Sequence, residues 1–171
     1  MPDHELKKVI GIDLTGAEKR ASGIALLWEN GQVRTKRLKT DEEIVAEVLA
    51  AKPDLISIDS PLSLPEDPTK IYRECELTLK RRGIGVYWCL LPSMKALTMR
   101  GIALAARLRD EGFKVIESYP GAAQDILGTP GKARESKRWP RPSLNMVLRE
   151  TWPFHMTNWM PSLLPLWGSF T

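Results

Sequence analysis

Apolar and polar residues alternate near the start of the chain in a way that predicts three antiparallel strands. Residues 9–14 (VIGIDL) are rich in β-forming side chains, and residues 25–28 repeat that apolar character after a turn-like segment. The tripeptide ENG at residues 29–31 is a hairpin signal, and residues 32–38 (QVRTKRL) alternate as a half-exposed strand does. We therefore expect the fold to begin with a strand, a hairpin and a third strand.

Helical and strand patterns then follow one another. Thr40 and Glu43 have the spacing of a capping box at the start of a helix, and Lys52-Pro53 ends that helix. Residues 55–59 (LISID) predict a short strand whose apolar character suits a sheet interior with both faces covered. Beyond it we expect a helix over 71–82, an aromatic loop over 83–94, a helix over 95–111 capped by Gly112, a strand over 113–118 and a short helix over 120–127. The resulting order, β-β-β-α-β-α-α-β-α, predicts an α/β fold: a mixed sheet with helices on its faces.

Three of the predicted strands run through apolar residues into a carboxylate. The acids are Asp13 in VIGID, Asp59 in LISID and Glu117 in KVIES. If parallel neighbours carry them, the acids meet at one edge of the sheet, where like charges must be offset by protons or cations. A divalent metal is the simplest solution, and two Mg²⁺ or Mn²⁺ ions about 4 Å apart can activate a water and stabilise the leaving oxygen in phosphodiester hydrolysis. Oxygen ligands argue against zinc, and neither histidine lies in these motifs.

Each acid, taken singly, also has a structural interpretation. Asp59-Ser60-Pro61 is compatible with the start of a turn, and Asp13 with a hairpin turn. Glu117 is favourable near a helix N-terminus. Three strand ends with the same feature favour the acidic cluster over three separate structural roles.

Composition narrows the class of protein. The chain has 171 residues, of which 43% are hydrophobic and 27% charged, a globular balance in which one domain is the default. No apolar run approaches the roughly 20 residues that span a bilayer, and the polar start is not a signal peptide, so we expect a soluble, cytoplasmic protein without a membrane partner. The two cysteines lack metal-type spacing and are expected to be reduced thiols.

The positive charge is unevenly placed. The net charge is +4, with one basic run at residues 80–82 and another between residues 132 and 141. Either run is compatible with nucleic acid as a partner, although a solvated helix end is the commoner meaning of such a run.

Four segments in sequence order are similar to a known family. They are GIDLTGAEKRASGIALL, DLISIDSPLSLP, YRECELTLKRRG and VIESYPGAAQDILG. Over residues 8–131 the chain resembles the DUF429 proteins, predicted nucleases with a ribonuclease H-like fold. The resemblance implies a ribonuclease H-like domain over 1–131, with the mixed sheet of three antiparallel strands followed by parallel strands. It also implies that Asp13, Asp59 and Glu117 bind the metal ions, Mg²⁺ or Mn²⁺.

The third of these segments adds an arginine and an acid. They match Arg73 and either Glu74 or Glu76. Arg73 could contact a substrate phosphate, but an arginine on an amphipathic helix is more commonly solvent-facing or part of a structural ion pair.

Residues 132–171 differ from the rest of the chain. They hold four of the six tryptophans and five of the thirteen prolines, and the resemblance stops at about Lys132. The family implies a C-terminal helix with a motif similar to H-D-E-L-D-A, which would supply a fourth acid. No such motif is visible in this reading frame.

The codons of residues 155–168 (HMTNWMPSLLPLWG) offer an explanation. Read one base earlier, they spell [HY]-D-[EKQ]-L-D-A, followed by small or apolar residues and a glycine. We therefore interpret residues 132–171 as an aberrant tail that follows a change of reading frame near residues 128–140. The alternative is a genuinely divergent, irregular tail, and in either case the chain lacks an evident fourth carboxylate.

These observations favour a metal-dependent nuclease that hydrolyses the phosphodiester bonds of DNA or RNA, with activity impaired by the altered C-terminus. One alternative is an inactive member of the family that binds nucleic acid or a protein partner. Another is a nucleotide-binding protein, because Asp13-Leu14-Thr15-Gly16 resembles the first phosphate loop of actin-like ATPases and sugar kinases. Those proteins need two such cores, and a chain of 171 residues holds only one.

Overall fold

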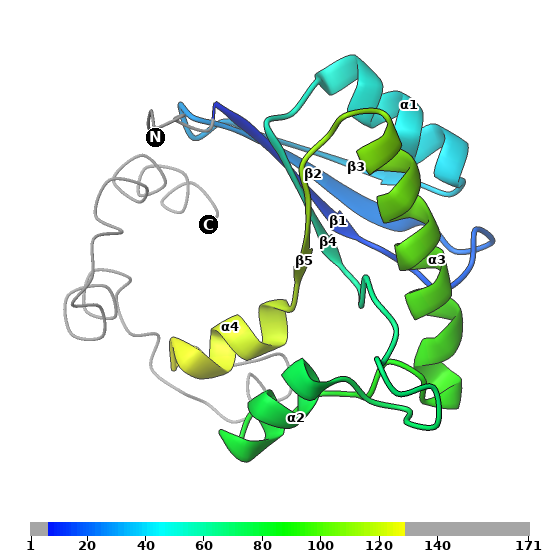
Figure 1. The fold of residues 1–171 in the computed structure, drawn as a ribbon. Helices are drawn as coiled ribbons and strands as arrows, with labels where there is room; N and C mark the ends of the chain where they lie inside the picture. The colour runs from blue at the N-terminus through cyan, green and yellow to red at the C-terminus, as the bar shows by residue number, and fades with distance from the viewer. Residues whose placement is uncertain (1–6, 129–171) are drawn as a thin grey trace.

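Elements of the predicted types follow one another in the predicted order (Figure 1). The structure is a computed structural model that describes residues 7–128. Its strands are β1 (Lys8–Asp13), β2 (Ser22–Trp28), β3 (Val33–Leu38), β4 (Leu55–Asp59) and β5 (Val115–Ser118), and its helices are α1 (Asp41–Ala51), α2 (Glu74–Arg81), α3 (Pro92–Asp110) and α4 (Pro120–Ile126). The predicted order of elements is confirmed.

The strands of this part of the chain form one mixed sheet in the order β3-β2-β1-β4-β5. β1 and β2 pair antiparallel, as do β2 and β3, whereas β4 pairs parallel with both β1 and β5. Three antiparallel strands followed by parallel ones are what the sequence predicted, and the arrangement is consistent with a ribonuclease H-like sheet. Because β1 and β4 run in the same direction, their C-terminal ends lie at the same edge of the sheet.

The hydrophobic core lies between one face of the sheet and the helices α1 and α3 (Figure 1). Side chains alternate between the two faces of a strand, so every second residue points to the helices. The buried residues include Ile10 and Ile12 of β1, Ile24 and Leu26 of β2, Ile56 and Ile58 of β4, Ile44, Val45 and Val48 of α1, and Leu104, Ala105 and Leu108 of α3. The core therefore fixes which face the remaining residues of each strand occupy.

The opposite face of the sheet is lined by small side chains, among them Gly11, Ala25 and Ser57. Both faces of β4 were expected to be covered, but α1 and α3 pack on one face only. Leu55 and Ser57 are accordingly half-buried, whereas Ile56 and Ile58 are fully buried. We refer to this side as the open face, with respect to residues 7–128.

Local signals place the helix ends. Thr40 is the N-cap of α1, and it forms the predicted capping box with Glu43. Gly112 lies just beyond α3 with a φ of 87°, a conformation that glycine adopts without strain. α3 begins earlier than predicted, with Pro92 in its first turn, because the ring of a proline there is already in a helical conformation. None of the helices described has the length and hydropathy to cross a membrane.

Candidate functional site

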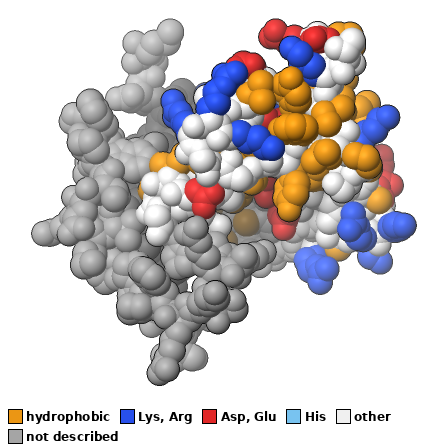
Figure 2. All heavy atoms as spheres, turned by 90° about the horizontal axis from the view of Figure 1, so that it is seen from below, with side chains coloured by type: hydrophobic (Ala, Val, Ile, Leu, Met, Phe, Trp, Pro, Cys, Tyr) orange, Lys and Arg blue, Asp and Glu red, His pale blue; other side chains and the backbone are white. Residues whose placement is uncertain are grey.

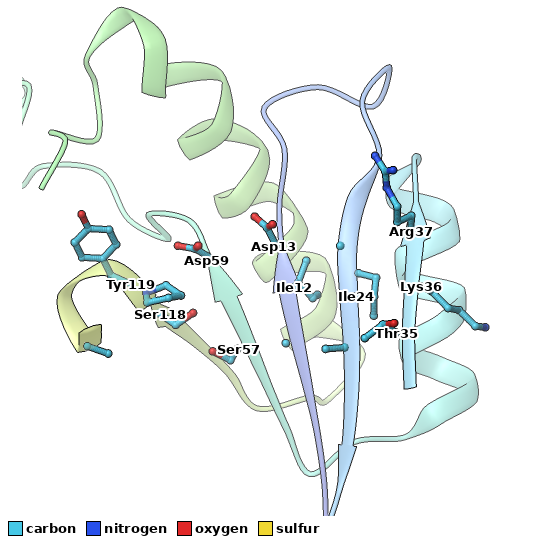
Figure 3. A pocket seen from close by; sticks show the side chains of 15 residues that line it. Ile12, Asp13, Ile24, Thr35, Lys36, Arg37, Ser57, Asp59, Ser118 and Tyr119 are labelled. Atoms are coloured by element: carbon cyan, nitrogen blue, oxygen red, sulfur yellow. The ribbon is translucent and has the colours of Figure 1, made fainter. Parts of the chain in front are cut away.

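β1 and β4 end side by side, and the last residue of each is an aspartate. Ile12 is paired with Ile58, so Asp13 and Asp59 occupy the next position on each strand. Both isoleucines point into the core, and the alternation of side chains therefore directs both aspartates to the open face. Figure 3 shows the two carboxylates at these neighbouring strand ends.

The open face lines an open cavity of about 890 Å³, and both aspartates are among the lining residues. Gly23 of β2 is the neighbour of Asp13, and a Cβ built on this glycine would be 3.5 Å from the Cβ of Asp13. Ser118 of β5 is the neighbour of Asp59. Small neighbours on both sides leave the carboxylates accessible from the cavity.

The carboxylate of Asp13 does not form the turn that follows it. Asp13 is exposed and makes no hydrogen bond or ion pair with any residue that the structure describes. The turn is held instead by the Thr15 N–H, which donates to Ser22 Oγ (3.1 Å), and by the Thr15 hydroxyl, which donates to the Arg20 carbonyl (2.9 Å). A hairpin-turn role therefore does not explain the acid at this position.

The turn after Asp59 is fixed by α3. The Ser60 N–H donates to the Ile58 carbonyl (3.0 Å), and the Ser60 hydroxyl lies 3.2 Å from the Leu97 carbonyl. Gly101 makes this approach possible, because a Cβ at that position would be 2.2 Å from Ser60 Oγ. A glycine on α3 thus decides where the strand end that carries Asp59 lies.

The residue before that glycine holds the loop after Asp13. The guanidinium of Arg100 donates to the Thr15 carbonyl (2.8 Å), to Asp41 (2.9 Å) and to the Lys39 carbonyl (3.0 Å). Arg100 is nearly buried, so these bonds replace its hydration. Two successive residues of α3 therefore support the two aspartate-bearing strand ends, and neither was identified from the sequence.

Glu117, the third predicted acid, lies on the other face of the sheet. It is paired with Ile58, so its side chain points to the helix-covered side. Both of its oxygens accept hydrogen bonds from Arg73, each 2.7 Å long, and Oε2 also accepts the Leu62 N–H (2.8 Å). The structure therefore brings together Asp13 and Asp59 and separates Glu117 from them, and a metal-ligand role for Glu117 stays a prediction.

Arg73 binds two carboxylates on the helix-covered side of the sheet. Besides Glu117 it binds Glu76 (Nε to Oε1, 2.9 Å) and Ser63 (Nη1 to Oγ, 3.0 Å), so four of its five N–H groups are engaged. Burial disfavours its charged form, but the two carboxylates outweigh that effect and raise the pKa of Arg73. This is the structural ion pair considered above, and the phosphate contact of Arg73 stays a prediction.

The carboxylate of Glu117 is held in its charged form. Burial opposes the ionisation of Glu117, yet the hydrogen bonds from Arg73 and Leu62, together with the charge of Arg73, lower its pKa. Glu76 is 1% exposed and also accepts the Cys89 N–H (3.2 Å), whereas Glu74 is exposed and pairs with Arg81. Of the two acids considered after Arg73, Glu76 is therefore the one in the network.

Tyr119 lies at the border of the cavity, beside Asp59 (Figure 3). Its hydroxyl donates to the Gly85 carbonyl (2.6 Å). Burial raises the pKa of Tyr119, and the charges of Asp125 and Asp59 add to the effect. Tyr119 is therefore a neutral hydrogen-bond donor that ties the start of α4 to the loop before α3.

A family model described as "Protein of unknown function (DUF429)" matches residues 11–149, most of the chain. The chain belongs to the DUF429 family. The match contains Asp13, Asp59, Glu117 and Arg73, and it continues past residue 131, where the resemblance was expected to stop. No curated protein matches the chain.

The side chains that could act as ligands decide whether a metal ion fits this DUF429 protein. Within residues 7–128 there is no group of three or more histidine, cysteine, aspartate or glutamate side chains that could hold one. Mg²⁺, however, usually keeps several waters and binds one or two protein carboxylates together with substrate phosphates. Asp13 and Asp59 fit one ion of that kind, whereas the predicted two-ion centre needs ligands that this part of the chain does not bring together.

Two residues of the basic run at residues 80–82 interact with neighbouring side chains. Lys80 Nζ lies 4.2 Å from the ring centre of Trp88, and Arg81 pairs with Glu74 (2.8 Å). Figure 2, seen from below, shows hydrophobic side chains gathered on one face with lysines and arginines around them.

Three features noted in the sequence lie outside the residues that the structure describes. They are the second basic run, the tail at 132–171 and the segment 155–168 whose codons suggest another reading frame.

Proposed function

We propose that this DUF429 protein is a cytoplasmic, Mg²⁺- or Mn²⁺-dependent nuclease that hydrolyses phosphodiester bonds of nucleic acid. One observation carries the proposal: Asp13 and Asp59 lie on adjacent parallel strand ends and point into the same open cavity. Asp13 has no partner in the described part of the chain, so its charge is available to a ligand.

The charge on the open face supports a cation there. Two neighbouring carboxylates repel each other and would also repel a phosphate, and a divalent ion offsets both effects. When bound, such an ion stabilises negative charge on the phosphate and lowers the pKa of an attacking water. Asp13 and Asp59 would hold that ion, and α3 keeps the two strand ends that carry them in place.

The accessible cavity favours a polymeric substrate. It extends from β3 to the start of α4 and is open to solvent, so a strand can enter from the side. We propose that activity is weakened in this chain, because two carboxylates bind an ion less firmly than the larger ligand set that the family resemblance implies.

The nucleotide-binding alternative is less well supported by the loop after Asp13. Its Thr15 N–H and hydroxyl are used within the loop, so these two donors are not offered to a phosphate. ATP turnover or saturable nucleotide binding would favour this alternative nonetheless.

The deciding experiment is a cleavage assay on DNA, RNA and hybrid substrates with Mg²⁺ or Mn²⁺. We expect Asp13→Asn and Asp59→Asn to abolish cleavage and to weaken Mn²⁺ binding measured by calorimetry. Asp110→Asn, a matched change of an exposed acid at the far end of α3, should leave both unchanged. If the wild type and Asp59→Asn behave alike on every substrate, the nuclease proposal fails. Binding of nucleic acid without cleavage would instead support the inactive family member.

A further inference from the structure

A row of residues crosses the open face of the sheet at the level of the two aspartates. Arg37 of β3 is paired with Gly23 of β2, and Gly23 is paired with Asp13 of β1. Asp59 follows on β4, and it is paired with Ser118 on β5. Paired residues point to the same face, so Arg37 belongs to the surface that carries both aspartates.

Arg37 differs from the other basic residues of its strand. Arg34 and Lys36 both form ion pairs with Glu47 of α1, although Lys36 also lines the edge of the cavity. Arg37 points to the open face, lines the cavity and makes no hydrogen bond or ion pair with the residues that the structure describes. Figure 3 shows it at the same end of the sheet as the two aspartates.

The position between Arg37 and Asp13 has no side chain. The glycine there leaves a shallow trough, and the Cα atoms of Arg37 and Asp13 are two strand spacings apart, about 10 Å. Arginine binds phosphate through its planar fork of N–H groups and keeps its charge at any physiological pH. A nucleic-acid backbone that lies along this row would therefore meet the cation of Arg37 as well as the two acids.

We propose that Arg37 binds the phosphate backbone of the nucleic acid on the β3 side of the reacting phosphate, whose place in the cavity is marked by Asp13 and Asp59. The bound strand then runs across the sheet, from β4 towards β3, over Gly23. This inference rests on the proposed function, because it uses the two aspartates as the position of the reacting phosphate. Arg37 is a binding residue in this arrangement and takes no part in the chemistry.

The test measures binding without cleavage. Fluorescence anisotropy with labelled single-stranded phosphorothioate DNA and RNA oligonucleotides, whose linkages resist hydrolysis, is recorded at a fixed Mg²⁺ concentration over a series of salt concentrations. We expect Arg37→Gln to raise Kd about tenfold for every sequence and to reduce the salt slope by about one, as the loss of one phosphate contact does. The matched control is Arg34→Gln, the same charge change on the opposite face of β3, which should alter Kd by about twofold or less.

Arg37→Lys keeps the positive charge but loses the planar guanidinium, so it separates the contribution of the charge to binding from that of the guanidinium geometry. It should restore the salt slope and only part of the affinity, because an ammonium lacks the fork of a guanidinium. Equal effects of Arg37→Gln and Arg34→Gln, or no binding by the wild type, would overturn the inference.

Its failure can be told apart from that of the proposed function. If Asp13→Asn and Asp59→Asn leave cleavage unchanged while Arg37→Gln still loses binding, the nuclease proposal fails and the Arg37 contact stands. If the aspartate variants abolish cleavage and the two arginine variants behave alike, the Arg37 contact alone is wrong.

Discussion

Arg73 and Glu117 join the start of α2 to the end of β5 through two parallel hydrogen bonds, each 2.7 Å long. The same carboxylate accepts the N–H of Leu62, in the segment that follows Asp59. The ion pair therefore helps to position a strand end of the candidate site, although it lies on the opposite face of the sheet.

Removal of the arginine should destabilise the protein. Arg73→Met leaves Glu76 buried and Glu117 half-buried without their cation, and the loss of one partner of a buried pair costs about 3 kcal/mol. Urea unfolding measures this change. Arg81→Met is the control, since its pair with Glu74 is exposed on both sides and should contribute about 0–1 kcal/mol. Similar losses in the two variants would contradict the structural role of Arg73.

The stability contributed by Glu117 should depend on pH. Its pKa is lowered from the ordinary value of 4.5 in the folded state, so its contribution is present above pH 4.5 and is lost as the pH falls through the folded-state pKa. Glu117→Gln does not titrate. The difference in unfolding free energy between the wild type and Glu117→Gln should therefore shrink below pH 4.5. A difference that stays constant in urea titrations down to that region would exclude this linkage.

A methyl group on Gly101 should disturb the turn after Asp59. Its Cβ would lie 2.2 Å from Ser60 Oγ, so either the turn or α3 must move. We expect Gly101→Ala to cost about 1–3 kcal/mol, as overpacking does, and to lower activity together with stability. Gly85→Ala serves as the comparison, because nothing lies within 4 Å of the added atom. Thermal unfolding that is unchanged in Gly101→Ala would show that the close approach is not required.

The two cysteines should react at very different rates. Burial and the charge of Glu76 raise the pKa of Cys89 to about 11, which keeps its thiol neutral and protected. Cys75 is exposed. Iodoacetamide at mildly alkaline pH should therefore label Cys75 in the native protein and Cys89 only after denaturation, as mass spectrometry would show. With Cys75→Ser, rapid native labelling should disappear, and labelling that persists would contradict the burial of Cys89.

The reading-frame hypothesis can be tested on the gene itself. Resequencing should find one base gained or lost upstream of the codons for residues 155–168, near residues 128–140. The corrected protein should contain H-D-E-L-D-A and bind Mn²⁺ more tightly than the present chain, because it has additional carboxylates. One continuous frame through this region, with no related sequence that reads H-D-E-L-D-A there, would exclude the hypothesis.

Much of the fold follows from short-range patterns. The hairpin after Trp28, the capping box of Thr40 and Glu43 and the strand that ends in Asp59 depend on neighbouring residues, and the sequence predicted each of them. The position of Asp13 and Asp59 at one edge of the sheet also followed, because two parallel strands that end in the same way bring their last residues to that edge.

The position of Glu117 shows where short-range patterns stop being sufficient. Its strand also runs into an acid, but the pairing of Glu117 with Ile58 places it one residue out of step with Asp59. Because side chains alternate with a period of two, one step of register moves a side chain to the other face. Register is set by the packing of whole strands and helices, which a single strand's sequence does not contain.

The sequence by itself thus determined the order of the elements, the mixed sheet and the meeting of Asp13 with Asp59. Only the tertiary structure decided that Glu117 binds Arg73, that Arg100 and Gly101 support the two strand ends, and that Arg37 shares their face. Each of these relationships joins residues that are distant in the chain, and it exists because α3 and the neighbouring strands pack in one particular register.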